Sequence, residues 1–163
     1  MQGNPKVIEF LNKALTNELT AINQYWLHYR VLHDWGVATL AEYERHESID
    51  EMKHADMLAE RVLFLGGLPN FQAIHSLKVG ETVEEILKAD LALEMEAIPL
   101  LREAAEYCQS VRDFVSGQLF EDILASEEEH VDFLETQFDM IARMGLENYV
   151  QLQSKPAGDG EAG

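Results

Sequence analysis

Apolar residues recur at alternating steps of four and three along the chain, which is the spacing of helices that bury one face. The first such stripe begins after Asn4-Pro5, an N-cap residue followed by a proline suited to the first helical position. Its members are Leu11, Leu15, Glu18, Ile22, Tyr25, Tyr29 and Leu32. The turn residues Asp34-Trp35-Gly36 end this helix. A second helix is predicted over about 39–65, ending at Gly66-Gly67.

Two more long helices are predicted in the second half of the chain. Thr82 and Glu85 have the spacing of a capping box. The stripe behind them is Leu87, Leu91, Glu94, Ile98, Leu101, Ala105 and Cys108. Pro99 lies inside this helix and removes a backbone hydrogen bond, so we expect a kink or bulge there. A fourth helix is predicted over about 113–144, with a short helix over 146–152 behind Gly145.

The segment 68–80 has no helical period and is long for a connection in a helix bundle. Such a crossover is needed when the third helix starts far from the end of the second. The pattern therefore predicts an all-α, ferritin-like four-helix bundle with a long crossover between helices two and three and a short C-terminal fifth helix. We expect one ferritin-like domain over residues 1–153. The small, polar tail over 154–163 is expected to be disordered.

Composition narrows the classes of function. There are 30 acidic and 12 basic residues, a net charge of −18, which argues against nucleic acid or an anionic membrane as a partner. Cys108 is the only cysteine, which excludes an internal disulfide and a cysteine-rich metal site. The first residues lack the segments of a signal peptide, and no apolar run is long enough to span a bilayer. We expect a reduced, cytoplasmic setting.

One motif occurs twice in register. Glu51-Met52-Lys53-His54 and Glu127-Glu128-Glu129-His130 both read Glu-x-x-His, which puts a carboxylate and an imidazole one turn apart on one helix face. Each follows a lone stripe glutamate, Glu18 or Glu94, by the same interval: 51 − 18 = 33 and 127 − 94 = 33. A single copy would more often arise by chance and face solvent. Two matched copies on apolar stripes predict a common centre of four glutamates and two histidines.

Four buried carboxylates need compensating positive charge. An unpaired buried carboxylate costs several kcal/mol or takes up a proton, against a total stability of roughly 5–15 kcal/mol. No lysine or arginine occupies the stripes at that level, whereas two divalent cations would neutralise four glutamates. Carboxylates with imidazoles and no thiolate suit iron or manganese and can also hold zinc. We prefer iron. Glu18 and Glu94 would each bind one ion, and His54 and His130 would each complete one ion. Glu51 and Glu127 would bridge the two ions.

Five further residues are candidates near this centre. Tyr25, two turns after the first lone glutamate, could bond a ligand carboxylate or give up an electron in dioxygen chemistry; a core tyrosine with a satisfied hydroxyl is an equally good interpretation. Met52 is rotated by about 100° from the metal stripe and so points off the core. It is an interface residue by default, although a thioether also binds haem iron. His46 and Asp50 share an adjacent face and, with Glu47, could assist cation transfer or simply be solvated.

The sequence resembles the bacterioferritins, the haem-containing bacterial ferritins, over about residues 1–153. The stretches that carry the resemblance are 11–19, 21–25, 46–56 and 145–149. The resemblance implies a homo-oligomer of twelve two-fold dimers that form a hollow shell of twenty-four subunits, with a ferroxidase di-iron centre at the six ligands above. It implies haem b between two subunits, bound by Met52 from each, and iron binding by His46 and Asp50 on the inner surface in some members. The implied function is oxidation of Fe(II) and storage of ferric mineral, with haem and a ferredoxin-type electron donor serving iron release.

The chain departs from the family pattern at three positions. Relatives often have Phe at the position of Trp26 and Trp at the position of Phe133, and some have Tyr at the position of Leu58. The last two changes remove candidate electron-relay aromatics and leave more of that role to Tyr25. Three other functions are alternatives. A peroxide-reducing enzyme like rubrerythrin usually has a second, cysteine-based iron domain. Met52 argues against a haem-free ferritin, and the lack of a basic arm argues against a DNA-protecting shell.

Overall fold

The computed structural model describes residues 1–158, which form five helices and, within that range, no strand. The helices are α1 (Pro5–Asp34), α2 (Ala38–Phe64), α3 (Val83–Ser110), α4 (Phe114–Met144) and α5 (Leu146–Leu152). The all-α prediction is confirmed, with helix ends within about two residues of those expected. Of the tail expected to be disordered, residues 159–163 lie outside the described part of the chain.

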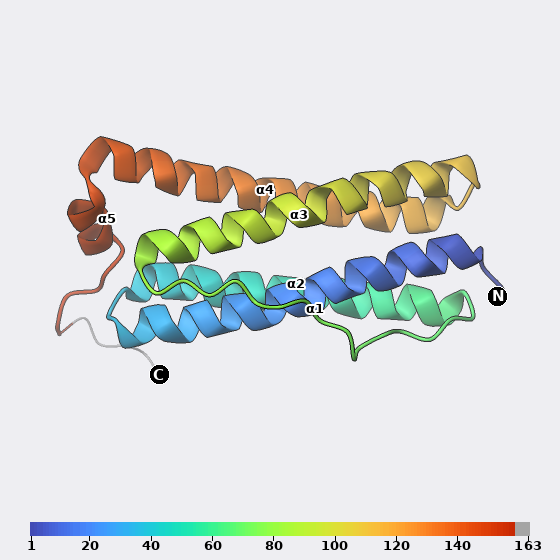
Figure 1. The fold of residues 1–163 in the computed structure, drawn as a ribbon, viewed down its shortest axis with the longest axis horizontal. Coiled ribbons are helices and arrows are strands. Elements are labelled where there is room, and N and C mark those ends of the chain that lie inside the picture. The colour runs from blue at the N-terminus through green and yellow to red at the C-terminus, as the bar shows by residue number, and fades with distance from the viewer. Residues whose placement is uncertain (159–163) are drawn as a thin grey trace.

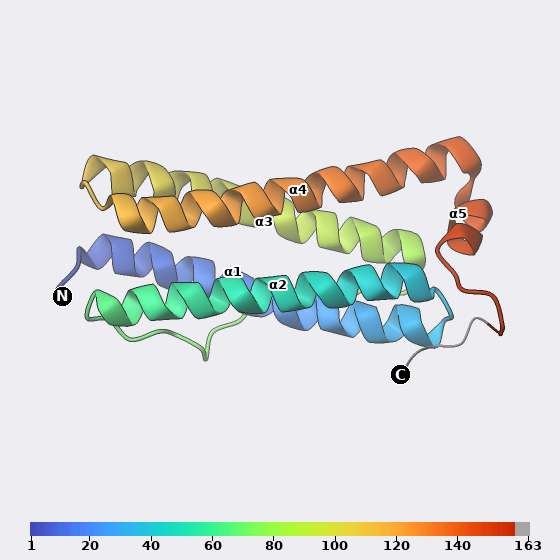
Figure 2. The same ribbon diagram turned by 180° about the vertical axis from the view of Figure 1, so that it is seen from behind.

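The four long helices form two antiparallel hairpins, α1 with α2 and α3 with α4, which lie side by side as a bundle (Figures 1 and 2). The crossover between α2 and α3 runs back along the bundle, so that α3 starts at the end where α1 finishes (Figure 1). α5 lies across that same end, after α4. The predicted long crossover and short fifth helix are therefore present. No helix among residues 1–158 has both the length and the apolarity to cross a bilayer.

Side chains at the helix starts accept the backbone N–H groups that have no partner within the helix. Asn4 Oδ1 accepts from the N–H of Lys6 at 2.8 Å, and Thr82 Oγ1 accepts from the N–H of Glu85 at 3.1 Å, as their positions predicted. The expected kink or bulge at Pro99 does not interrupt α3, which is helical from Val83 to Ser110.

The crossover is fixed to α1 by side chains spaced four or eight residues apart on one helix face. They accept backbone N–H groups of the crossover at 2.9 to 3.1 Å, in the pairs Asn12–Asn70, Thr20–His75, Gln24–Lys78 and His28–Gly80. These bonds satisfy backbone groups that have no helix or sheet partner. A Cβ atom added to Gly80 would lie 2.3 Å from the backbone nitrogen of Ile86, so only glycine fits where the crossover meets α3.

The bundle core has a polar layer between two apolar ones. The apolar layer near the N-terminus includes Leu11, Leu15, Leu58, Leu101 and Phe120. The layer at the other end includes Leu32, Leu40, Leu87, Leu134 and Tyr149. On every long helix the predicted metal ligands fall between these two sets in the sequence, so they meet at the middle of the bundle.

Candidate metal centre

All four long helices contribute ionisable side chains to the polar layer. The six predicted ligands are between 1% and 8% exposed: Glu18 of α1, Glu51 and His54 of α2, Glu94 of α3, and Glu127 and His130 of α4. The Glu-x-x-His spacing keeps both members of a motif on the inward face. Because the interval of 33 residues is the same in both hairpins, each hairpin places its lone glutamate and its Glu-x-x-His motif at the same level of the bundle.

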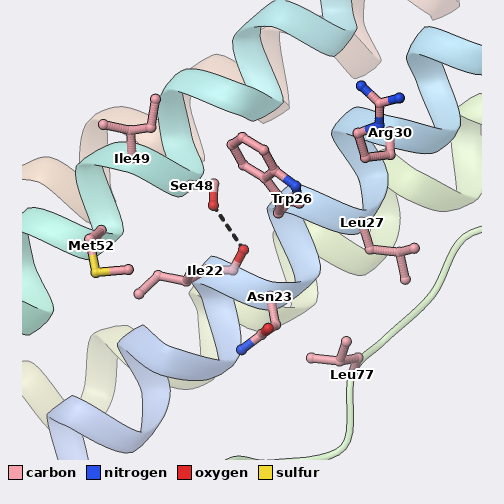
Figure 3. Close-up of a pocket in the computed structure, with 9 residues that line it drawn as sticks. All are labelled: Ile22, Asn23, Trp26, Leu27, Arg30, Ser48, Ile49, Met52 and Leu77. Atoms are coloured by element: carbon pink, nitrogen blue, oxygen red, sulfur yellow. Dashed lines mark hydrogen bonds between the residues drawn. The ribbon is translucent and has the colours of Figure 1, made fainter.

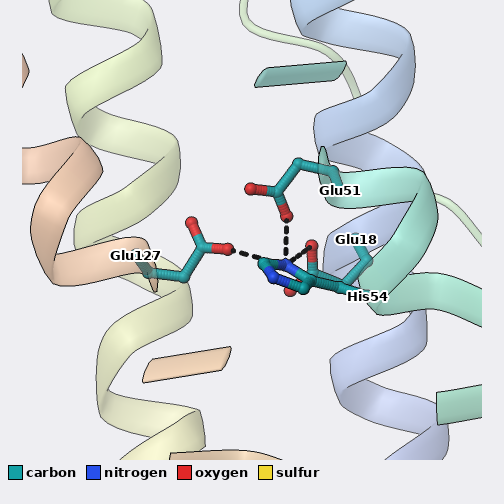
Figure 4. Close-up of side chains that lie close together, drawn as sticks. All are labelled: Glu18, Glu51, His54 and Glu127. Atoms are coloured by element: carbon teal, nitrogen blue, oxygen red, sulfur yellow. Dashed lines mark hydrogen bonds and ion pairs between the residues drawn. The ribbon is translucent and has the colours of Figure 1, made fainter. Parts of the chain in front are cut away.

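The first group of side chains joins α1, α2 and α4 (Figure 4). His54 Nδ1 lies 3.4 Å from Glu51 Oε2, 3.4 Å from Glu127 Oε1 and 3.7 Å from Glu18 Oε2. One candidate ligand atom from each of the four residues lies within 4.8 Å of all the others. A single cation among them could contact three carboxylates and one imidazole.

The second group consists of Glu51, Glu94, Glu127 and His130, again with ligand atoms within 4.8 Å of one another. His130 Nδ1 lies 3.1 Å from Glu94 Oε1. Glu51 and Glu127 belong to both groups, which is the arrangement that two bridging carboxylates require. The two groups are therefore candidates for two adjacent cation sites.

Four carboxylate oxygens of these groups have no hydrogen-bond partner in the described structure: Glu18 Oε2, Glu94 Oε2 and both oxygens of Glu127. Leaving a buried polar atom unpaired costs about 1–3 kcal/mol, and more for a charged one. The donor set of oxygen and nitrogen without sulfur fits iron, manganese or zinc. The residues present thus fit a pair of divalent cations.

The pKa values of the metal-free centre reflect its crowded negative charge. Burial, together with the charges of Glu51 and Glu94, raises the pKa of Glu127 well above its usual value. Burial opposes a charge on His130, but its hydrogen bond to Glu94 and that carboxylate's charge outweigh burial and raise the pKa of His130 to about 9. Burial likewise opposes a charge on His54, and Glu51 outweighs it, so the pKa of His54 is also raised. Cations must therefore displace protons when they bind.

Tyr25, the tyrosine expected near the centre, is fully buried. Its hydroxyl donates a hydrogen bond to Glu94 Oε1, and its ring packs edge-on against His130 with 5.0 Å between ring centroids. Burial and the charge of Glu94 raise the pKa of Tyr25, so the hydroxyl stays protonated. Both interpretations of this tyrosine hold at once: it is a satisfied core residue and it bonds a candidate ligand.

The remaining candidates on α2 are less buried. Glu47 Oε2 lies 3.6 Å from His130 Nδ1, and its side chain is 16% exposed, so it reaches the edge of the centre. His46 is exposed and Asp50 is half-buried, and their nearest charged neighbours are Glu42 and Lys53. Among residues 1–158, His46 and Asp50 join no group of three or more ligating side chains.

A third buried group, His28, Glu44 and Asp90, was not anticipated from the sequence. His28 Nδ1 and Gln24 Nε2 each lie 2.9 Å from Asp90 Oδ1. The N–H of Gly80 bonds His28 Nε2, so Nδ1 carries the proton and donates it to Asp90, which leaves no imidazole lone pair for a metal. Burial and Asp90 raise the pKa of Glu44. Both oxygens of Glu44 and Oδ2 of Asp90 have no hydrogen-bond partner in the described structure. Hydrogen bonds thus fix His28 and one oxygen of Asp90, and the imidazole is not available to a metal.

The sequence did contain a signal for two of these residues. Asp90 precedes Glu94 by four residues and Glu44 precedes Glu51 by seven, the steps that keep side chains on one helix face. The helical period of the second helix allows either Tyr43 or Glu44 to face the core. The structure buries Glu44 in the core and leaves Tyr43 half-buried at its edge.

Met52 lies off the core, as its rotation from the metal stripe predicted, and is 52% exposed. It borders a groove of about 610 Å³ formed mainly by α1 and α2. Figure 3 shows the Met52 side chain near Ile22 and Ile49, with the indole of Trp26 farther along the same groove. The groove is thus largely apolar, with a thioether on its wall.

Several known proteins are similar to this chain in sequence over nearly its whole length. The chain matches the family model described as a ferritin-like domain over residues 8–144. It is 53% identical to the bacterioferritin of Brucella melitensis over 161 residues, which is 99% of this chain and 100% of that protein. Identity to the bacterioferritin of Rhodobacter capsulatus is 51% over 156 residues, 96% of this chain and 97% of that protein. Identity to the bacterioferritin of Streptomyces coelicolor is 48% over 165 residues, which is 98% of this chain and 99% of that protein. The chain therefore belongs to the ferritin-like family and, within it, to the bacterioferritins.

Proposed function

We propose that this chain oxidises ferrous iron at the six-residue centre and stores the ferric product. Membership of the bacterioferritins supports iron storage in general. The finer step, electron transfer from Fe(II) to dioxygen or peroxide, is inferred from the donor set and its burial. Iron is the substrate and, once stored, the cargo.

The observation that carries the proposal is that two groups of four ligating side chains share Glu51 and Glu127. In this assignment the two shared carboxylates bridge the ions, and each ion is completed by one further glutamate and one histidine: Glu18 with His54, and Glu94 with His130. Tyr25 orients Glu94 through its hydrogen bond. The apolar layers above and below the centre keep bulk water from the reacting ions.

We further propose a route for iron between the centre and the surface. Glu47 contacts His130 at the edge of the centre, and two neighbouring side chains of α2 are more exposed, Asp50 at 50% and His46 at 66%. An iron ion could bind in turn to His46 or Asp50 at the surface, to Glu47, and then to the centre.

The proposal includes haem b, held between two copies of the chain by Met52 from each. A thioether is a known axial ligand of haem iron, and the apolar groove beside Met52 suits a porphyrin face. Bound haem would carry electrons inward to reduce and release stored iron, with a ferredoxin-type protein as donor. The copies would assemble as two-fold dimers into a cytoplasmic shell of twenty-four subunits.

Metal and haem analysis of the intact assembly tests the proposal. We expect two iron ions per subunit after anaerobic loading with Fe(II), one haem per two subunits, and the mass of twenty-four chains by light scattering. Air should then convert added Fe(II) to ferric iron that stays with the protein. Absence of haem bands would favour a haem-free ferritin. Peroxide consumption without retained ferric iron would favour a rubrerythrin-like enzyme.

A further inference from the structure

Glu44 of α2 and Asp90 of α3 are two buried carboxylates that the function proposed above does not use. Both side chains are 0% exposed. Three of their four oxygens have no hydrogen-bond partner in the described structure: Glu44 Oε1, Glu44 Oε2 and Asp90 Oδ2. Burial removes water from such oxygens, so they are costly unless another partner replaces it. Three unpartnered oxygens in one part of the core therefore indicate a ligand between the two side chains.

This pair of carboxylates is close to the iron centre but separate from it. Asp90 precedes Glu94 by four residues on α3, which is about 6 Å along the helix axis. Glu44 precedes Glu51 by seven residues on α2, which is about two turns. Neither carboxylate belongs to the two groups of four ligating side chains described above. Glu44 comes from the first hairpin and Asp90 from the second, so a ligand between them would join the hairpins.

The residues around the pair supply hydrogen bonds but no positive charge. Gln24 Nε2 and His28 Nδ1 both lie 2.9 Å from Asp90 Oδ1, so that oxygen is already satisfied. His28 Nε2 accepts the N–H of Gly80, which makes His28 a neutral imidazole with no free lone pair. Among residues 1–158, no lysine or arginine pairs with either carboxylate. The negative charge of the pair must therefore be offset by a bound cation or by a proton.

The distance between the two carboxylates fits one metal ion. An oxygen of Glu44 lies within 4.8 Å of an oxygen of Asp90. Magnesium and calcium bind oxygen ligands at about 2.0–2.6 Å, so a single ion of this size can contact both side chains. Carboxylate oxygens without a thiolate or an available imidazole are the donors that magnesium, calcium and manganese prefer. Two positive charges on the ion would neutralise the two carboxylates.

We propose that Glu44 and Asp90 bind a third cation, a hard divalent ion of the magnesium and manganese class, about one helical turn from the iron centre. Its protein ligands are the two oxygens of Glu44 and Oδ2 of Asp90. The ion takes no part in the oxidation of iron. It joins the two hairpins and offsets negative charge in the core next to Glu94. This inference does not depend on the ferroxidase function proposed above.

Anomalous diffraction from crystals of the intact protein tests the site directly. The metal-free protein is first loaded with two zinc ions per subunit, which fill the six-residue centre because it offers two imidazoles and the third site offers none. The crystals are then soaked in Mn²⁺, and maps from the two sides of the manganese absorption edge distinguish manganese from zinc. We expect one manganese peak per subunit between Glu44 and Asp90. Manganese found only at the six-residue centre or on the surface would overturn the inference and favour a proton shared by the pair.

Glu44→Gln tests the same site in solution, because it keeps the size of the side chain and removes its charge. Electron paramagnetic resonance of free Mn²⁺ measures how many ions the zinc-loaded protein binds. Glu44→Gln should bind one Mn²⁺ fewer per subunit than the unmodified protein. Glu103→Gln, which removes an exposed carboxylate of α3, is the matched control and should bind as many as the unmodified protein. Equal binding by Glu44→Gln and the unmodified protein would refute the third site. Zinc stoichiometry and the rate of Fe(II) oxidation test the ferroxidase proposal separately.

Discussion

The hydroxyl of Tyr25 on α1 donates a hydrogen bond to Glu94 on α3, although 69 residues separate them in the chain. This bond ties the first hairpin to the second at the level of the metal centre. It also directs one oxygen of Glu94, which leaves the carboxylate's other oxygen, Oε2, without a hydrogen-bond partner. A residue that would otherwise be one core aromatic among several therefore positions a candidate ligand.

Tyr25→Phe should slow Fe(II) oxidation and leave the fold intact. The lost hydrogen bond to a charged acceptor contributes about 1.5–3 kcal/mol, and a misplaced Glu94 should lower the initial rate by about tenfold. Stopped-flow absorbance of the ferric product measures the rate, and urea unfolding measures stability. Tyr149→Phe loses a hydrogen bond to the neutral amide of Gln137, so it should lose about 0.5–1.5 kcal/mol of stability without slowing oxidation. Equal rates in the two variants would show that the Tyr25 hydroxyl does not act on the centre.

Glu127→Gln should stabilise the metal-free protein and weaken metal binding. Burial and neighbouring carboxylates raise the pKa of Glu127, so the folded chain must hold a proton there, a requirement that the amide removes. Loss of a shared ligand should reduce zinc binding from two ions per subunit to one or fewer. Calorimetry measures the binding, and thermal unfolding of the metal-free protein measures stability. The exposed neighbour variant Glu129→Gln should change neither quantity.

Zinc affinity should increase with pH up to about 9. His130 is protonated in the metal-free folded chain below its raised pKa of about 9, and zinc must displace that proton. Each displaced proton makes the affinity rise about tenfold per pH unit below that value. The same proton stabilises the metal-free fold below about pH 6.5, the ordinary value, and this contribution is lost as pH rises through 9. Titration calorimetry in buffers of different ionisation enthalpy counts the protons, and His130→Gln should release one fewer.

Glu44→Gln should change how the stability of the metal-free protein depends on pH. Burial and Asp90 raise the folded pKa of Glu44 above its usual 4.5, so above that pH the folded chain binds more protons than the unfolded chain. Stability must then fall as pH rises from 4.5 towards the folded pKa. The amide can still donate to Asp90 and has no proton to lose, so its advantage over glutamate should grow with pH in urea unfolding. Glu42→Gln, exposed on the same helix, should show no such trend.

Met52→Leu should abolish haem binding and leave Fe(II) oxidation unchanged. The substitution keeps the apolar volume of the groove wall and removes the only atom there that is proposed to bind haem iron. The Soret absorbance per subunit after reconstitution with haem measures the effect. Met57→Leu changes another exposed methionine of α2 and should retain haem. Normal haem content in Met52→Leu would refute the assignment of Met52.

The helices and the six inward-facing residues were determined by the sequence alone. The helical period assigns each stripe residue to the buried face, and the doubled interval of 33 puts Glu18 with Glu51 and Glu94 with Glu127 at one level. Asn4 and Thr82 predicted the helix starts because the backbone N–H groups that they cap lie only two or three residues away in the chain.

The contacts around the centre were decided only by tertiary structure. His28 meets Gly80 across 52 residues, and Tyr25 meets His130 across 105. Whether Tyr43 stacks on Phe133 depends on how α2 packs against α4. No sequence period relates such pairs, because their meeting depends on the packing of the crossover and of one hairpin against the other. Local periodicity thus decides which side chains face the core. Long-range packing decides which neighbours hydrogen-bond those side chains and shift their pKa values.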